Sequence, residues 1–190
     1  MRPVVGTTAN THAILLETPR LILREHVPGD LPPLHAMLSD PATTWYLPDM
    51  RKDDPAETEA YLRSVMRDAG DHTRLRYNLM IVERASGEAA GSVGLHVIDG
   101  GEGGAHYGLG YFVRQDLWNR GYATEAVAAA LDYIFAEDAF RVTASCLAEN
   151  LSSRRVLEKC GFSMEGLLKR HTLHDGQWKD CAIYGRLKEG

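Results

Sequence analysis

The strongest constraint in this sequence is a short apolar strand that runs through a polar turn into an alanine-rich helix, between residues 109 and 133. The apolar run from Leu109 to Val113 predicts a strand. Alanines of high helix propensity, with Val127 and Leu131 on one face, predict a helix that opens at Gly121. Because glycine admits a ligand close to the backbone and a helix start leaves N–H groups free, the junction predicts an anion site, with phosphate as the obvious ligand.

The composition limits what else the chain can be. With 190 residues, 44% hydrophobic and 25% charged, we expect one globular domain over residues 14–190 behind a flexible tail of residues 1–13. The net charge of −5 gives no general attraction to nucleic acid or to an anionic membrane, so local geometry must hold any anion. No apolar run reaches the ~20 residues that span a bilayer, and the tail lacks the apolar core of a signal peptide. The cytoplasm is therefore the default location.

The three cysteines, Cys146, Cys160 and Cys181, form no CxxC pair. An odd number at wide spacing predicts buried, reduced thiols and indicates neither a disulfide framework nor a metal site. The sequence also lacks a GxGxxG fingerprint and a P-loop, which argues against a nucleotide-binding enzyme of either kind.

Periodicity and turn residues predict the remaining elements. We expect strands at residues 15–24, 77–82, 90–98, 105–113, 141–147, 162–169 and 181–187. Helices are predicted to begin at Asp30, near residue 56, at Gly121 and at Asn150, with Asp30 and Asn150 as side-chain N-caps. Residues 40–55 are expected to be irregular, and the glycine-rich residues 99–104 to form a flexible turn. His174-Asp175-Gly176 is a turn-forming cluster, so His174 is expected to be a turn residue of the last hairpin.

Two stretches of this sequence resemble the GNAT acetyltransferases. Trp118-Asn119-Arg120-Gly121-Tyr122-Ala123 is similar to their acetyl-CoA motif, Gln/Arg-x-x-Gly-x-Gly/Ala, with Trp118 where Gln or Arg is commonest. A tryptophan followed by Gly-Tyr-Ala-Thr-Glu resembles the Rim-type (RimJ/RimL-like) branch, which acetylates the N-termini of ribosomal proteins. Asn150-x-x-Ser153 followed by residues 157–162 is similar to a second family motif. The resemblance covers residues 18–187, in the family's own order of elements.

The resemblance implies a fold and a way of binding acetyl-CoA as cosubstrate. The fold is mixed α/β: a mostly antiparallel sheet of about seven strands with about four helices, splayed between the fourth and fifth strands, which end at Val113 and Leu147. Pantetheine would pair with the backbone of this fourth strand, and the pyrophosphate would lie on N–H groups at the helix start. The implied cofactor-binding residues are Tyr111, Phe112, Val113, Asn119, Arg120, Gly121, Tyr122, Ala123, Thr124, Asn150 and Ser153.

The catalytic groups depart from the family pattern. Relatives place a glutamate on the fifth strand and a tyrosine in the next helix, and the matching positions here are Ser145 and Leu157. An acid common in the Rim-type branch is matched by Gly108. His106, on the same face as Gly108, is a candidate base, and Ser153 is a candidate acid for the leaving thiolate. Packing is the alternative role for His106 and helix-start hydrogen bonding for Ser153, and water could also take the amine proton.

The resemblance implies an N-acetyltransferase whose acceptor is a primary amine, with a protein or peptide N-terminus as the first choice. A small-molecule acceptor, such as an antibiotic or a polyamine, is the runner-up. A non-catalytic acyl-CoA binder is the alternative of a different class, favoured by the missing glutamate and tyrosine. Trp45 and Tyr46 either form part of the acceptor wall or plug the edge of the core. Dimers are frequent in the branch, so the resemblance also suggests a homodimer.

Overall fold

The computed structural model describes residues 13–71 and 73–189. In this part of the chain, eight strands form one sheet in the order β1-β2-β3-β4-β5-β6-β8-β7. The strands are β1 (Leu15–Glu17), β2 (Leu21–Glu25), β3 (Arg76–Glu83), β4 (Ala89–Gly101), β5 (Gly104–Val113), β6 (Ala139–Leu147), β7 (Ser163–His174) and β8 (Gln177–Leu187). The helices are α1 (Leu31–Ser39), α2 (Pro41–Thr44), α3 (Pro55–Ala69), α4 (Tyr122–Ala136) and α5 (Leu151–Lys159), with short 3₁₀ turns η1 (Pro28–Asp30), η2 (Pro48–Met50) and η3 (Gln115–Leu117).

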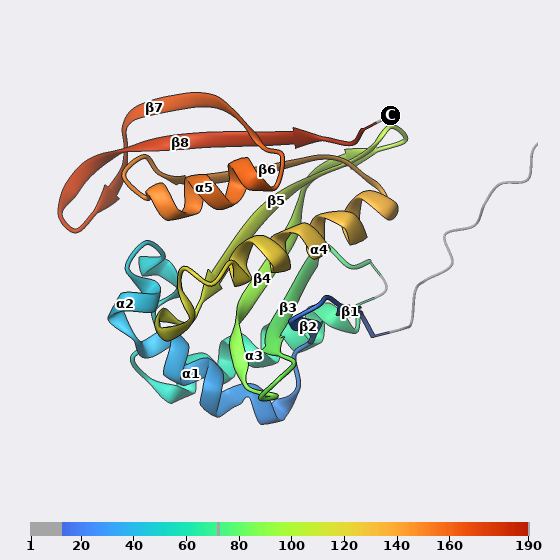
Figure 1. The fold of residues 1–190 in the computed structure, drawn as a ribbon, viewed down its shortest axis with the longest axis vertical. Coiled ribbons are helices and arrows are strands. Elements are labelled where there is room, and N and C mark those ends of the chain that lie inside the picture. The colour runs from blue at the N-terminus through green and yellow to red at the C-terminus, as the bar shows by residue number, and fades with distance from the viewer. Residues whose placement is uncertain (1–12, 72, 190) are drawn as a thin grey trace, which may run out of the picture.

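Helices cover both faces of the sheet (Figure 1). Because successive side chains of a strand point to opposite faces, β3 contributes to two separate cores. Leu79 and Ile81 pack in the core beneath α4 and α5, whereas Met80 and Val82 pack with α1 and α3. The sheet is therefore the middle layer of three.

The structure confirms the predicted fold class. Each neighbouring pair of strands is antiparallel except β5 with β6, which are parallel. The described residues contain eight strands and five α-helices, where about seven and about four were predicted. The tail predicted for residues 1–13 falls, apart from Ala13, outside the described residues.

The additional strand comes from the segment 15–24, where the prediction of a single strand was wrong. Thr18 ends the first strand, since its backbone N–H donates to Leu21 O at 2.9 Å and its Oγ1 accepts from Leu21 N at 2.9 Å. The chain therefore folds back as the hairpin β1–β2, with Leu15 opposite Arg24.

The glycine-rich segment also differs from its prediction. Instead of a flexible turn at residues 99–104, β4 and β5 stay paired as far as Gly101 opposite Gly104, which leaves only residues 102–103 to turn. The pairing shifts by one residue between Val97 and Asp99, a β-bulge at Ile98. Beyond this bulge, the glycines extend the hairpin.

Two predictions about aspartates and caps need correction. Residues 40–55 are not wholly irregular, because Asp40 accepts from the N–H groups of Ala42 (3.1 Å) and Thr43 (3.0 Å) and so caps α2. Asp30 precedes α1 but its carboxylate does not cap the helix. It is buried and accepts instead from Arg24 at 2.7 and 2.8 Å.

The start of α4 is held by the β1–β2 turn. Glu125, in its first turn, accepts hydrogen bonds from Thr18 Oγ1 (2.6 Å), Arg20 N (2.9 Å) and Arg20 Nε (2.6 Å). The Arg20 guanidinium also lies over the Tyr122 ring, 4.8 Å from its centroid. Burial by itself would raise the pKa of Glu125, but the hydrogen bonds from Thr18 and Arg20 outweigh it and lower the pKa below 4.5.

We predict that Glu125→Gln lowers the free energy of unfolding by about 1–2 kcal/mol at pH 7, because it removes charged hydrogen bonds to a side chain that is only 14% exposed. A carboxylate with a lowered pKa stabilises the fold fully above its unfolded value of 4.5 and loses this effect as pH falls through the folded value. The difference between wild type and variant should therefore shrink below pH 4.5. Urea unfolding followed by circular dichroism measures it.

Glu59→Gln is the matched control, since Glu59 makes an exposed ion pair with Arg63 on the surface of α3. We expect a change below about 0.5 kcal/mol there. Equal effects of the two substitutions would contradict an anchoring role for Glu125.

Candidate active site

The sheet opens between β5 and β6. Their parallel pairing runs from Ala105 opposite Ala139 to Gly108 opposite Thr143 and then stops. β5 continues to Val113 and β6 to Leu147, each still paired on its other side with β4 and β8. Within the described residues, no strand pairs with the β6-side edge of residues 109–113, so backbone groups there are free to meet a ligand.

A cavity of about 420 Å³ occupies this opening. The residues that line it come from the unpaired part of β5, the η3–α4 turn, the end of β6, α5, and Thr43, Tyr46 and Leu47 in and after α2. Those predicted from sequence to bind the cofactor and found in the lining are Tyr111, Phe112, Val113, Asn119, Gly121, Tyr122, Ala123, Thr124, Asn150 and Ser153. The structure thus brings together ten of the eleven.

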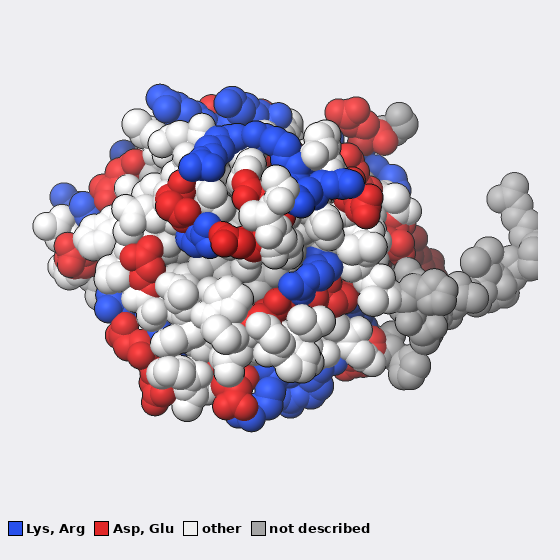
Figure 2. Space-filling view, turned by 60° about the horizontal axis from the view of Figure 1, so that its bottom comes forward, with Lys and Arg blue, Asp and Glu red and all other residues white. Residues whose placement is uncertain are grey.

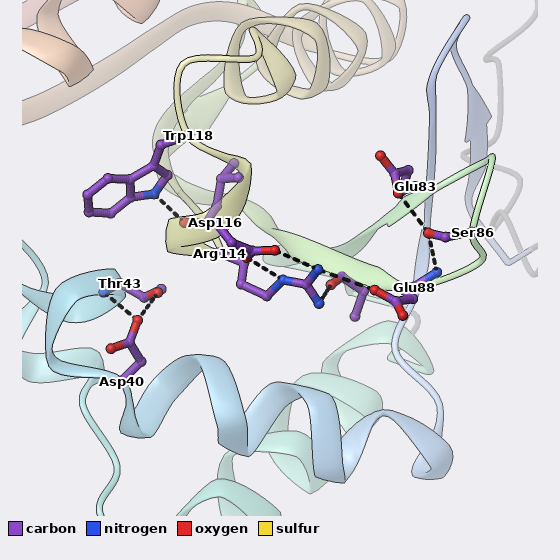
Figure 3. Close-up of polar contacts among 10 residues, drawn as sticks. Asp40, Thr43, Glu83, Ser86, Glu88, Arg114, Asp116 and Trp118 are labelled. Atoms are coloured by element: carbon purple, nitrogen blue, oxygen red, sulfur yellow. Dashed lines mark hydrogen bonds and ion pairs between the residues drawn. The ribbon is translucent and has the colours of Figure 1, made fainter.

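The turn into α4 presents backbone N–H groups to this cavity. Asn119 (φ 59°) and Gly121 (φ 79°) both adopt the left-handed conformation, and no side chain caps the helix. Trp118 Nε1 donates to Val113 O at 2.7 Å, which fastens the turn to the end of β5 (Figure 3). Free N–H groups and the helix dipole at such a start both favour an anion.

Of the two arginines near the turn, Arg114 has its guanidinium engaged elsewhere. The Arg114 guanidinium bonds Asp116 Oδ1 at 2.7 Å and Glu88 Oε2 at 3.3 Å (Figure 3), and Asp116 raises its pKa. Arg120 is the predicted residue that does not line the cavity, and its carbonyl accepts from Arg20 Nη1 at 2.7 Å. Acidic and basic side chains are also interspersed on the face seen in Figure 2. Two cationic residues of α5, Arg155 and Lys159, line the cavity, so their charges add to the backbone N–H groups in favouring an anion.

Asn150 and Ser153 lie at the start of α5. Asn150 Oδ1 accepts from Ser153 N at 3.1 Å, so Asn150 is the helix N-cap as expected. The Ser153 hydroxyl is 2.9 Å from the Tyr111 hydroxyl, which also donates to Ser153 O at 3.2 Å. Burial raises the pKa of Tyr111, so this phenol stays protonated. The pair joins β5 to α5 across the opening and places two hydroxyl groups in the cavity wall.

The other catalytic positions considered from the sequence fall in different places. His106 Nε2 is 2.8 Å from Thr143 Oγ1, in the paired part of the sheet, and the ring does not line the cavity. Ser145 and Leu157 both line the cavity, but Leu157 belongs to the buried core and Ser145 is exposed. Cys146 lines it as well, and burial raises the pKa of its thiol.

A second cavity, of about 440 Å³, lies under α3 and shares part of β5 with the first. Both are lined by Leu47 and by residues 109–112. The second is lined in addition by Tyr61 and Asp68 of α3, Arg76 and Asn78 of β3, and His96 of β4. Sequence reasoning missed these five residues, because only the strand register and the packing of α3 bring them to the same place.

The end of the β7–β8 hairpin closes against the α1–α3 connection. The buried His174 donates from Nε2 to Trp45 O at 2.6 Å, and its ring packs against Trp45 and Tyr46. Tyr46 lines the first cavity. Trp45 lines neither cavity. The Trp45 and Tyr46 side chains are 48% and 38% exposed, so they do not plug the core. His174 was predicted only as a turn residue, so its burial is a correction.

No group of three or more His, Cys, Asp or Glu side chains in the described residues is arranged to hold a metal ion. None of the helices in them is long and apolar enough to cross a membrane.

Comparison with known proteins gives consistent relatives. Residues 20–163 match the family model described as an acetyltransferase (GNAT) domain. An uncharacterized N-acetyltransferase, p20, from Bacillus licheniformis is 28% identical over 174 residues, which cover 91% of this chain and 96% of that protein. A solved GNAT-family acetyltransferase from Bacillus anthracis superposes with a TM-score of 0.79 at 27% identity, over 93% of this chain and all of that one.

A third relative has a named substrate. The [ribosomal protein uS5]-alanine N-acetyltransferase of Escherichia coli is 36% identical over 76 residues, 40% of this chain and 39% of that protein.

We predict that His174→Ala loosens the wall formed by residues 43–47. The substitution removes a buried hydrogen bond and two aromatic contacts, so we expect a loss of about 1–3 kcal/mol in stability. Amide hydrogen exchange should become faster in residues 43–47. His171→Ala is the control, because His171 is exposed on the same strand, and unchanged exchange in both variants would contradict the assigned contact.

Proposed function

The chain belongs to the GNAT acetyltransferase family, and we propose that it transfers the acetyl group of acetyl-CoA to the N-terminal amine of a protein or peptide. The observation that carries the proposal is the unpaired edge of residues 109–113 beside the uncapped start of α4. Such an edge can pair with an extended ligand as an added strand would. An uncapped helix start next to it suits a pyrophosphate.

The residues present fit acetyl-CoA as the acetyl donor. The backbone of Tyr111, Phe112 and Val113 would pair with pantetheine, and the N–H groups of Asn119, Arg120, Gly121, Tyr122, Ala123 and Thr124 would hold the pyrophosphate. Asn150 faces the same cavity while it caps α5. Ser153 would protonate the leaving thiolate, and its hydrogen bond to the Tyr111 hydroxyl supplies a second proton donor.

The choice of acceptor is supported by the relative that acts on an alanine of ribosomal protein uS5. We therefore test peptides that begin with alanine first. The assay measures thiol release from acetyl-CoA in the presence of N-terminal peptides, of peptides with a blocked N-terminus, and of spermidine.

We predict thiol release that depends on a free peptide N-terminus. Release with spermidine alone would overturn the peptide assignment and favour a small-molecule acceptor. Binding of acetyl-CoA without release for any acceptor would favour an acyl-CoA binder and sink the proposed transfer.

We predict that substitution of Gly121 weakens acetyl-CoA binding, whereas substitution of Ser153 slows the chemical step. Gly121→Ala forces a side chain into the left-handed region at φ 79°, 3.4 Å from Arg20 Nη2, at a cost of about 1–2 kcal/mol. The dissociation constant of acetyl-CoA should therefore rise about tenfold. Ser153→Ala should lower kcat by about 100-fold and leave that constant unchanged. Isothermal titration and steady-state kinetics measure the two effects.

Gly87→Ala is the control for backbone strain. Gly87 has a similar φ of 73° in the β3–β4 turn, with nothing within 4 Å of an added Cβ, and does not line either cavity. It should lose stability without losing affinity for acetyl-CoA. Equal losses of affinity at both glycines would refute the assigned pyrophosphate site.

A further inference from the structure

On the face of the sheet under α3, Gly94, Gly108 and Gly110 place no side chains of their own over β4 and β5. Gly94 pairs opposite Gly110, and His96 pairs opposite Gly108. Nothing lies within 4 Å of a Cβ added at Gly110. The space over Gly110 is therefore open, and the same residue lines both cavities.

The imidazole of His96 fills the place that a side chain at position 108 would take. A Cβ added to Gly108 would lie 2.3 Å from His96 Cε1 and 2.5 Å from His96 Nε2. Position 108 is where Rim-type relatives commonly have an acid. In this chain the titratable group at that place is the imidazole of His96, from the neighbouring strand. In the part of the chain that the structure describes, neither ring nitrogen of His96 has a hydrogen-bond partner, whereas the His106 ring is held by Thr143.

Asp68 gives this cavity an attraction for cations. Its Oδ2 is buried without a hydrogen-bond partner among the described residues, and the nearest cationic atom, Arg76 Nη1, is 3.9 Å away. A carboxylate oxygen in that state favours a positively charged donor such as an ammonium. The cavity thus combines an open space, a carboxylate oxygen with a long ion pair but no hydrogen bond among the described residues, and an imidazole.

The surroundings of His96 favour its neutral form, which can accept a proton. The groups that face it are Arg76 from β3, His106 from β5, and Asp68 and Tyr61 from α3. Burial lowers the pKa of His96 below 6.5, and the charges of Arg76 and His106 lower it further. The imidazole is therefore neutral at pH 7.

We propose that the second cavity, which lies under α3 and is called the α3-side cavity below, binds the acceptor amine as its ammonium, attracted by Asp68. His96 then removes the proton that the amine must lose before it attacks the thioester. The inference rests on the proposed function, since it assigns a base and an acceptor site to the same transfer. It places the base on β4 in the space over Gly108.

The transfer balances with these groups. The ammonium gives one proton to His96, which passes it to solvent, and the freed nitrogen lone pair forms the N–C bond at the thioester carbonyl. The C–S bond then breaks, and its electron pair leaves on sulfur as a thiolate. Ser153 protonates this thiolate, and the remaining excess proton of the new amide nitrogen restores the serine hydroxyl. The products are the amide, the free thiol of CoA and one proton.

The test compares His96→Ala with His106→Ala in the full chain. The acceptors are the alanine peptide and spermidine, with acetyl-CoA saturating. For His96→Ala we expect kcat/KM for the acceptor to fall at least 100-fold, in the range of general-base effects, with the affinity for acetyl-CoA unchanged. In wild type, kcat/KM should decrease as pH falls through the lowered His96 value, below 6.5, and the variant should lack this limb. Added imidazole should restore part of its rate.

Asp68→Asn should raise the acceptor KM more than it lowers kcat. Retention of wild-type turnover and of the acidic limb by His96→Ala would overturn the inference, as would loss of that limb in His106→Ala alone. A wild type that transfers acetyl to neither acceptor would overturn the proposed function and this inference with it. An active wild type with a normal His96→Ala would overturn only the inference.

Discussion

The structure depends above all on where the pairing of β5 with β6 ends. Beyond Gly108 and Thr143 the two strands diverge, and each remains in the sheet through its other neighbour. Buried backbone groups require partners, so an unpaired edge is stable only where water or a ligand can reach it. Both cavities, the uncapped start of α4 and the Tyr111–Ser153 hydrogen bond lie around this opening. One break in a ladder therefore determines where the cavities lie and which side chains line them.

Much of this architecture could be predicted from the sequence wherever an element is determined by neighbouring residues. The apolar run ending at Val113, the glycine at φ 79° and the Asn150 cap each follow from a few neighbouring residues. Two of the errors have local physical causes as well. Thr18 supplies a turn that hydropathy does not reveal, and cross-strand hydrogen bonds hold glycines 100, 101 and 104 in regular pairing. His174 was taken for a turn residue because its partners are 128–129 positions away in the chain.

The α3-side cavity could not be predicted from the sequence, because its lining depends on a single β-bulge. Without the bulge at Ile98, the turn at residues 102–103 would set His96 opposite Leu109, on the face that packs in the core. A shift of one residue moves every side chain of a strand to the other face. The bulge instead sets His96 opposite Gly108, over the bare part of the sheet. A single extra residue, with no hydropathy signal of its own, thus decides which cavity contains an imidazole.

These features account for the glycine at position 108, where the resemblance to the Rim-type branch implies an acid. A carboxylate on β5 and the His96 ring could not both occupy that space, because any Cβ there would lie within 2.5 Å of the imidazole. Glycine at 108 and histidine at 96 therefore depend on each other. Replacing His96 alone with a smaller residue leaves a gap, and replacing Gly108 alone creates a clash. The same logic holds at Gly94, where Asn78 Oδ1 lies 2.6 Å from an added Cβ. Side chains from β3 and β4 therefore occupy the space above the glycines of this sheet face. The chemistry of this site depends on the register of these strands as much as on residue type.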